Sequence, residues 1–210
     1  MTKFAPPSAT NSPSTSTIQL SASAFSEEGR WKVDALGSPH IGERSEKALI
    51  ASFVGRTAEL SPQLVTFNGS SFDFPVLRYR AMVHAVAAPG LSLRRYFNRY
   101  TEDAIDLCDV LSSFSFQGKT TLHELCRVMG LPGKPGGING GEVEKFYREG
   151  RVREIAEYCE SDVINTYRVW LRYELFCGRL SNADFEASEA GLVDFIRAHG
   201  NTKPYPTDLM

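Results

Sequence analysis

The sequence predicts an α/β domain in which helices flank a mixed β-sheet. The chain has 210 residues, a length that suits one domain, and 42% of them are hydrophobic, which is enough for a sizeable core. The periodic patterns follow one another as hairpin, helix, strand, helix, strand and several helices. That alternation favours a sheet with helices on its faces.

The first half of the chain supplies the hairpin and the first helix–strand unit. Residues 18–25 and 30–37 alternate apolar and polar side chains around a turn with Gly29, which is typical of a β-hairpin. A helix is expected over 42–60, with Ser45 as its N-cap. The continuous apolar run 63–67 predicts an interior strand.

The second half is mostly helical. Residues 104–111 read as a strand that passes into a helix, and 121–130 as a short helix closed by Gly130. The remaining predicted elements are a helix over 75–86, a glycine-rich loop over 131–141, a long helix from about residue 150, and a last helix over 183–199.

The expected domain spans residues 18–200. Residues 1–17 are rich in Ser, Thr and Pro and predict a disordered or loosely packed arm, and 201–210 form a tail. The N-terminus lacks the order of a signal peptide, and no apolar run approaches the roughly 18 residues of a membrane-spanning helix. The four cysteines are widely spaced, which is typical of reduced core cysteines. A cytoplasmic protein without membrane association is therefore expected.

The nearly balanced charge excludes binding of nucleic acid through a globally basic surface. The chain has 23 basic and 25 acidic residues, a net charge of −2, so any phosphate-binding surface must be local. An exposed charged face and a phosphate-contacting surface are both compatible with the densest basic region, which consists of Arg78, Arg80, Arg94, Arg95 and Arg99.

Asp73 is a single acidic side chain at the joint between a strand and a helix. Asn68-Gly69 lets the chain turn after the strand, and Pro75 suits the first turn of a helix. The carboxyl ends of strands are where open α/β sheets place their sites. The simpler interpretation of Asp73 is a carboxylate that caps the helix N-terminus.

Tyr158 and Asp162 form a second candidate constellation. They lie four residues apart on the long helix and therefore share one face, beside its apolar stripe. An aspartate at such a place is costly unless it is paired or binds a metal ion. The simpler interpretation is a tyrosine–aspartate hydrogen bond or an ion pair between helices.

Taken together, these segments resemble a known family. The stretch "LVTFNGSSFDFPVLRYRAMVH" looks like the second motif of DnaQ-like 3′–5′ exonucleases, and "YCESDV" looks like their third motif, in the tyrosine subclass called DEDDy. The segments "DLCDVLSSF", "LPGKPGGINGGEVEKFYREGR" and "EIAEYCESDVINTYRVWLR" match, in order and spacing, the branch of predicted exonucleases related to the proofreading domain of B-family polymerases. The resemblance covers roughly residues 18–180.

The resemblance implies a ribonuclease-H-like mixed sheet flanked by helices and a two-metal hydrolysis of the terminal phosphodiester. Two Mg²⁺ or Mn²⁺ ions about 4 Å apart serve such a reaction. Carried over to this chain, Asp73 and Asp162 would be metal-binding carboxylates, and Tyr158 would orient the attacking water. Asp106, at a strand end, would contact the metal-binding residues and not the metal ions themselves.

The implied substrate is the 3′ end of single-stranded DNA or RNA. Phe72 would wedge against terminal bases, and Arg78 and Lys134 would contact phosphates. Asn68 would contact substrate, or hydrogen-bond the backbone of its own turn. Phe74 is expected in the core instead.

One departure from the family concerns the first motif, Asp-x-Glu on a central first strand ahead of the hairpin. No Asp-x-Glu precedes the hairpin here, and residues 1–17 contain no acidic residue. Two carboxylates cannot neutralise two divalent ions, so this chain is expected to be impaired and to lack its central strand. An internal starting methionine explains the pattern, and a degenerate paralogue is the alternative.

Three functions therefore compete. The first is a metal-dependent 3′–5′ exonuclease that is active in a longer form. The second is a catalytically silent module that binds nucleic acid or protein through the same cleft. The third is a structural scaffold in a homo-oligomer that covers the exposed sheet edge.

Overall fold

The computed structural model describes residues 21–37, 44–133 and 140–199. The predicted arm 1–17 and tail 201–210 lie outside the described residues. The strands are β1 (Ser21–Glu27), β2 (Arg30–Gly37), β3 (Leu64–Thr66) and β4 (Ala104–Asp106). The helices are α1 (Glu46–Leu60), α2 (Asp73–Val83), α3 (Pro89–Leu93), α4 (Leu107–Leu111), α5 (Leu122–Val128), α6 (Val143–Arg148), α7 (Val152–Phe176) and α8 (Asn182–His199), with short 3₁₀ turns η1 (Phe116–Gly118) and η3 (Gly140–Glu142).

A parallel pair of short strands lies between two helical layers. β3 and β4 pair in the register Leu64↔Ala104, Val65↔Ile105 and Thr66↔Asp106. Successive side chains of a strand point to opposite faces. Leu64 and Ala104 accordingly join one hydrophobic cluster, whereas Val65 and Ile105 join another.

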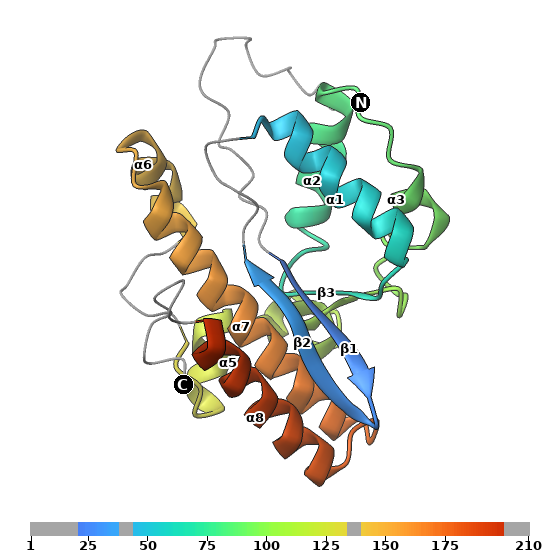
Figure 1. Cartoon of the computed structure of the whole chain (residues 1–210), viewed down its shortest axis with the longest axis vertical. Coiled ribbons are helices and arrows are strands. Elements are labelled where there is room, and N and C mark those ends of the chain that lie inside the picture. The colour runs from blue at the N-terminus through green and yellow to red at the C-terminus, as the bar shows by residue number, and fades with distance from the viewer. Residues whose placement is uncertain (1–20, 38–43, 134–139, 200–210) are drawn as a thin grey trace.

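The first cluster belongs to α1, α2 and α3, which lie together on one side of β3 (Figure 1). The Ser45 hydroxyl accepts a hydrogen bond from the Ala48 N–H at 3.3 Å, so the predicted N-cap of α1 is confirmed. The buried members of this cluster are Ile50, Val54, Phe74, Leu77, Ala81, Leu91, Tyr96 and Ala104.

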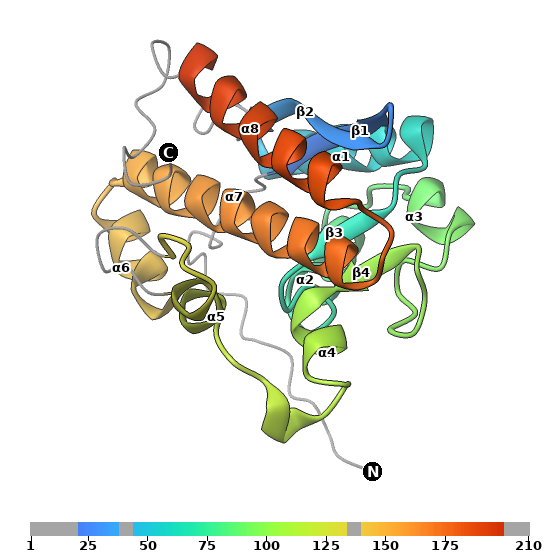
Figure 2. The ribbon, with the colours of Figure 1, turned by 90° about the horizontal axis from the view of Figure 1, so that it is seen from below.

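The second cluster is built around α7, the 25-residue helix that runs through the middle of the molecule (Figure 2). The hairpin β1–β2 and helix α8 pack against it, and α5 lies on its other side. The rings of Trp31 and Trp170 meet edge to face with centroids 4.6 Å apart. The Trp31 N–H also donates to Ser188 Oγ at 2.9 Å, which fastens the hairpin to α8.

The predicted hairpin is confirmed. β1 and β2 are antiparallel from Ser21↔Gly37 to Glu27↔Arg30. Glu28 and Gly29 both have positive φ, at 52° and 89°. Two consecutive positive φ values match the strand twist that a tight hairpin needs.

The α/β class is confirmed, and the sheet is smaller than expected. The strands described form two ladders of two strands each, one antiparallel and one parallel. Within residues 21–199 as described, no hydrogen-bonded pairing joins the two ladders. The run 63–67 was expected as an interior strand, yet among the described residues β3 pairs only with β4 and is half-buried. The pattern also did not predict the short helices α3 and α6.

The described residues contain neither a membrane-spanning helix nor a disulfide. None of the described helices is both long enough and apolar enough to cross a membrane. All four cysteines are free; Cys108 and Cys126 are buried, whereas Cys177 is exposed.

Candidate active site

Asp106 locks the turn that leads from β3 into α2. Its residue surface is 3% exposed, and it ends β4 beside the last residue of β3. Its Oδ1 accepts the N–H of Asn68 at 2.7 Å, and its Oδ2 accepts the N–H of Ser70 at 2.9 Å. Oδ1 also accepts the N–H of Cys108 at 3.1 Å, which caps α4. One buried carboxylate therefore fixes the backbone of the turn against the end of the neighbouring strand.

The turn itself is sterically tight. Asn68 has a positive φ of 66° and its carbonyl accepts the N–H groups of Ser71 and Phe72 at 3.2 and 3.1 Å. A Cβ added to Gly69 would lie 2.5 Å from the Thr66 side chain, closer than any two such atoms can approach. Only glycine fits at that position, so the Asn-Gly pair sets the direction in which α2 begins.

Asp73 is the first residue of α2. The N-cap position belongs to Phe72, which makes no side-chain capping bond, so Asp73 lies one position beyond the predicted cap. The residue surface is exposed, but protein packed around the carboxyl group raises the pKa of Asp73. Its own backbone N–H opposes this shift, and the nearby Asp106 carboxylate adds to it. Two acidic groups therefore lie near each other at the carboxyl edge of the parallel ladder.

Tyr158 and Asp162 interact on α7. Their side chains are hydrogen-bonded, and burial together with the Asp162 charge raises the pKa of Tyr158 well above its ordinary value. The phenol is therefore protonated at neutral pH and donates to the carboxylate. The simpler interpretation, a tyrosine–aspartate hydrogen bond, is thus what the structure shows for this pair.

Asp162 lies close to the α5 side of the helix. Its Oδ1 is buried, and its charge contributes, after burial, to raising the pKa of Cys126 on α5 to about 11. The carboxylate is therefore held in a protein-lined environment. Such an environment favours a cation as partner, because a buried anion is otherwise costly.

The described residues do not complete a site for a divalent ion. Among them there is no group of three or more histidine, cysteine, aspartate or glutamate side chains placed to hold a metal. The structure instead brings together Asp73 with Asp106 and Tyr158 with Asp162. Whether the two pairs share an ion stays a prediction.

The predicted substrate contacts differ in their surroundings. Phe72 is 64% exposed, whereas Phe74 is 7% exposed and belongs to the core, as expected. Arg78 stacks on Phe97 with its guanidinium carbon 3.9 Å from the ring centroid. Lys134 lies outside the described residues.

The other arginines of the basic region are engaged with carboxylates. Arg80 pairs with Glu46, Arg94 and Arg95 with Asp103, and Arg99 with Asp109. For these four an ordinary charged face is the simpler interpretation, because each guanidinium lies beside a carboxylate, with Asp103 shared by Arg94 and Arg95.

Sequence reasoning missed Asp109. Its side chain is 0% exposed and accepts both Nε and an Nη of Arg99 at 2.6 Å, while Lys119 Nζ lies 2.9 Å away. These contacts anchor α4 to the segments before and after it. The acidic residue three positions after Asp106 was the available signal, but a single aspartate gives no hint of a buried partner.

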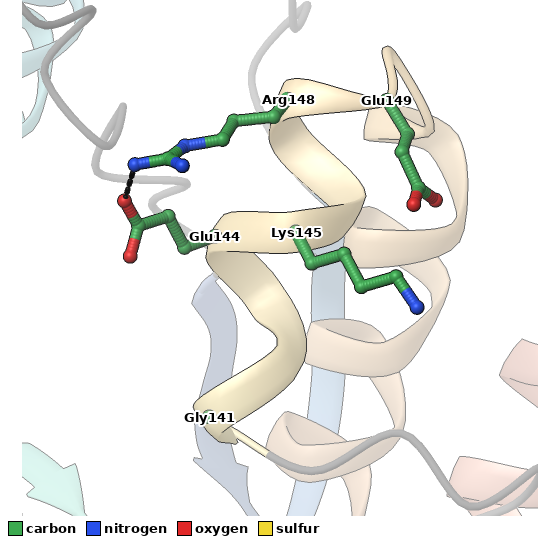
Figure 3. A pocket seen from close by; sticks show the side chains of 5 residues that line it. All are labelled: Gly141, Glu144, Lys145, Arg148 and Glu149. Atoms are coloured by element: carbon green, nitrogen blue, oxygen red, sulfur yellow. Dashed lines mark hydrogen bonds and ion pairs between the residues drawn. The ribbon is translucent and has the colours of Figure 1, made fainter.

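A surface hollow of about 330 Å³ lies beside α6 (Figure 3). Its charged lining consists of Glu144, Lys145, Arg148 and Glu149, and Glu144 is paired with Arg148. Two acids and two bases leave no net charge, so the hollow has no preference for an anion or a cation.

The comparisons with known proteins decide the family. The model of predicted 3′–5′ exonucleases related to the exonuclease domain of PolB matches residues 10–208. The chain belongs to this exonuclease family. The match spans all four candidate residues of the site, and the resemblance inferred from the motifs is confirmed. No significant match was found among curated proteins or among solved structures.

Proposed function

We propose that this chain is the domain of a metal-dependent exonuclease that removes nucleotides from the 3′ end of single-stranded DNA or RNA. The observation that carries the proposal is the carboxylate pair Asp73 and Asp106 at the carboxyl edge of β3 and β4 in a member of an exonuclease family. This edge is where α/β sheets place their sites.

The proposed roles differ among the four residues. Asp73 and Asp162 are assigned as ligands of Mg²⁺ or Mn²⁺, since such hard cations prefer carboxylate oxygens. Tyr158 is assigned to orient the attacking water through its phenol oxygen, which can accept a hydrogen bond while its proton is donated to Asp162. Asp106 accepts hydrogen bonds from three backbone N–H groups and thereby positions the turn that leads to Asp73.

The proposed metal site needs acidic ligands besides Asp73 and Asp162. Two carboxylates leave most of the charge of two divalent ions uncompensated, and the described residues hold no third ligand in place. We propose that an Asp-x-Glu pair on a strand next to β3 completes the site in the active form. The fold of that form is proposed to be ribonuclease-H-like, with this strand between the two ladders.

The test is digestion of a single-stranded oligonucleotide in the presence of Mn²⁺. We compare this chain, a form preceded by an Asp-x-Glu strand, and Asp73→Asn and Asp162→Asn in that form. With a 5′ label, exonuclease action gives a ladder that shortens from the 3′ end, and both variants abolish it. Failure of the extended form, or full activity of both variants, overturns the proposal.

A catalytically silent binding module is the second candidate. It is favoured by the absence of a complete metal-binding group among the described residues. Binding of oligonucleotide by both forms without any cleavage would support it.

An oligomer in which a second copy covers the half-buried edge of β3 predicts twice the monomer mass in gel filtration.

A further inference from the structure

A stretch without acidic residues follows Asp73. Residues 74–101 contain five arginines and no aspartate or glutamate, in a chain whose net charge is −2. The stretch covers α2, α3 and the segment that leads to β4. Within the stretch itself the charge is positive, and an arginine in it that no carboxylate neutralises favours an anionic partner.

Arg78 is the arginine of this stretch that keeps its charge available. The other four are paired with carboxylates, whereas in the parts of the chain that the structure describes Arg78 has no carboxylate partner. Its guanidinium stacks on Phe97, and that ring meets the buried Phe74 edge to face at 6.2 Å. A planar cation held in this way is oriented in advance to bind a phosphate through two N–H groups.

Large apolar side chains lie exposed on the same helix. Tyr79, Met82 and Val83 are 65–70% exposed, and Phe72 at the start of the helix is 64% exposed. They lie on the side of α2 that faces away from its buried residues. An exposed aromatic ring on the same helix as an available cation is a combination that can bind the bases and phosphates of a single strand.

We propose that this face of α2, formed by Arg78, Tyr79, Met82 and Val83, binds single-stranded nucleic acid. Arg78 contacts a phosphate and the Tyr79 ring stacks on a base, so that the strand lies along α2. Asp73 begins the same helix. That the bound strand ends at Asp73 rests on the proposed function, but the binding itself does not.

The experiment measures binding without catalysis. Fluorescence anisotropy of a 5′-labelled oligothymidylate is followed in EDTA at several salt concentrations, with this chain and its variants. Arg78→Gln is expected to weaken binding roughly tenfold and to reduce the slope of log K against log salt by about 0.7, the value of one single-strand phosphate contact. Arg78→Lys should keep that slope and lose part of the affinity, because lysine lacks the planar fork.

Tyr79→Ala tests the stacking contact separately. It is expected to weaken binding roughly tenfold, as loss of one base-stacking ring does, with the salt slope unchanged. Arg197→Gln is the matched control, because this exposed arginine lies on α8, at the other end of the molecule from α2 (Figure 1). It should lower the affinity less than twofold.

Three results would overturn the inference. They are no binding by the unmodified chain, equal effects of Arg78→Gln and Arg197→Gln, and a dimer in gel filtration that Tyr79→Ala dissociates. The last would assign the face to a second copy of the chain. Binding by this chain, together with no cleavage by the form that carries the Asp-x-Glu strand in Mn²⁺, would instead contradict the proposed function and leave this surface in place.

Discussion

At the scale of single residues, the backbone around the site depends on one buried carboxylate. Asp106 accepts hydrogen bonds from Asn68, Ser70 and Cys108, and thus joins the turn after β3 to the start of α4. Asp73 has its place because this turn is fixed. The position of Asp73 consequently depends on Asp106, whose carboxylate is hydrogen-bonded to backbone N–H groups.

Replacing Asp106 should therefore be costly. Asp106→Ala leaves three N–H groups without their acceptor and is expected to lower the free energy of unfolding by about 3–5 kcal/mol. Asp106→Asn keeps an oxygen for two of the three donors and should cost about 1–2 kcal/mol. Urea denaturation measures both. Equal stability of the alanine variant and the unmodified chain would show that the turn does not depend on this carboxylate.

The Asp109 ion cluster makes stability depend on pH. Hydrogen bonds from Arg99 lower the pKa of Asp109, burial opposes this, and Lys119 adds to the lowering. A lowered folded-state pKa stabilises the protein above the ordinary carboxyl range, and the stabilisation is lost as pH falls through the lowered pKa. Asp109→Asn should thus be less stable than the unmodified chain at neutral pH.

That difference should shrink as pH falls below about 4, the ordinary value for aspartate. Unfolding free energies measured across this range test it. Asp194→Asn is the control, because Asp194 is 79% exposed and lies 4.0 Å from its partner Arg197. A pH-independent difference for Asp109→Asn would contradict the assignment.

The sequence predicted some of these residues and not others. Asp73 and Asp162 were recognisable because an acidic group among apolar residues costs free energy unless it is paired or binds a metal ion. Tyr158 was recognisable because it lies on the same helix face as Asp162. Asp106 was recognisable at a strand end. The stacking of Arg78 on Phe97 was not predictable, because it joins α2 to a segment about twenty residues away whose path no local pattern reveals.

At the scale of elements, the turn between β3 and α2 is the most constrained connection. Gly69→Ala would place a methyl group against the Thr66 side chain and should destabilise the protein by about 1–3 kcal/mol. Gly55→Ala, in the exposed interior of α1, has nothing within 4 Å of the new methyl group and should stabilise by up to about 1 kcal/mol.

Thermal or urea unfolding of the two glycine variants gives the comparison. A loss of stability in both would show a general intolerance of added methyl groups and would remove the special role of this turn. A gain in both would show that Thr66 moves aside without cost.

Periodicity predicted the long elements well and the short ones poorly. α1, α7 and α8 have apolar stripes that repeat over several turns, so their sequence settles their type. α3 and α6 are one or two turns long, and such short patterns cannot be told from loops. β3 read as an interior strand because its residues are apolar, but apolarity does not say how many neighbours a strand has.

At the scale of the whole molecule, the β3–β4 ladder joins two hydrophobic clusters. One of its faces packs with α1, α2 and α3, and the other packs with α7. Because both clusters share these two strands, they are expected to unfold together.

The two tryptophans allow a test of this cooperation. Trp31 and Trp170 both report on the cluster around α7, whereas far-ultraviolet circular dichroism reports on every helix. The transitions seen by fluorescence and by circular dichroism are expected to coincide in urea. A fluorescence transition at lower urea would show that the hairpin leaves α7 before the rest unfolds.

The α/β class and the family were predictable from element order and from two separated motifs, while the pairing of the ladders was not. Pairing between strands far apart in sequence depends on which edges meet in space. The missing Asp-x-Glu pattern predicts an incomplete metal site, and this stays a prediction.

The central claim is that Asp73 and Asp162 serve one cation site. Crystals of the form that carries the Asp-x-Glu strand, soaked in Mn²⁺, test it most directly, through an anomalous difference map. The account predicts a manganese peak within coordination distance of oxygens from both carboxylates. Side chains that lie on opposite sides of the molecule, or separate peaks that never include both residues, would contradict it.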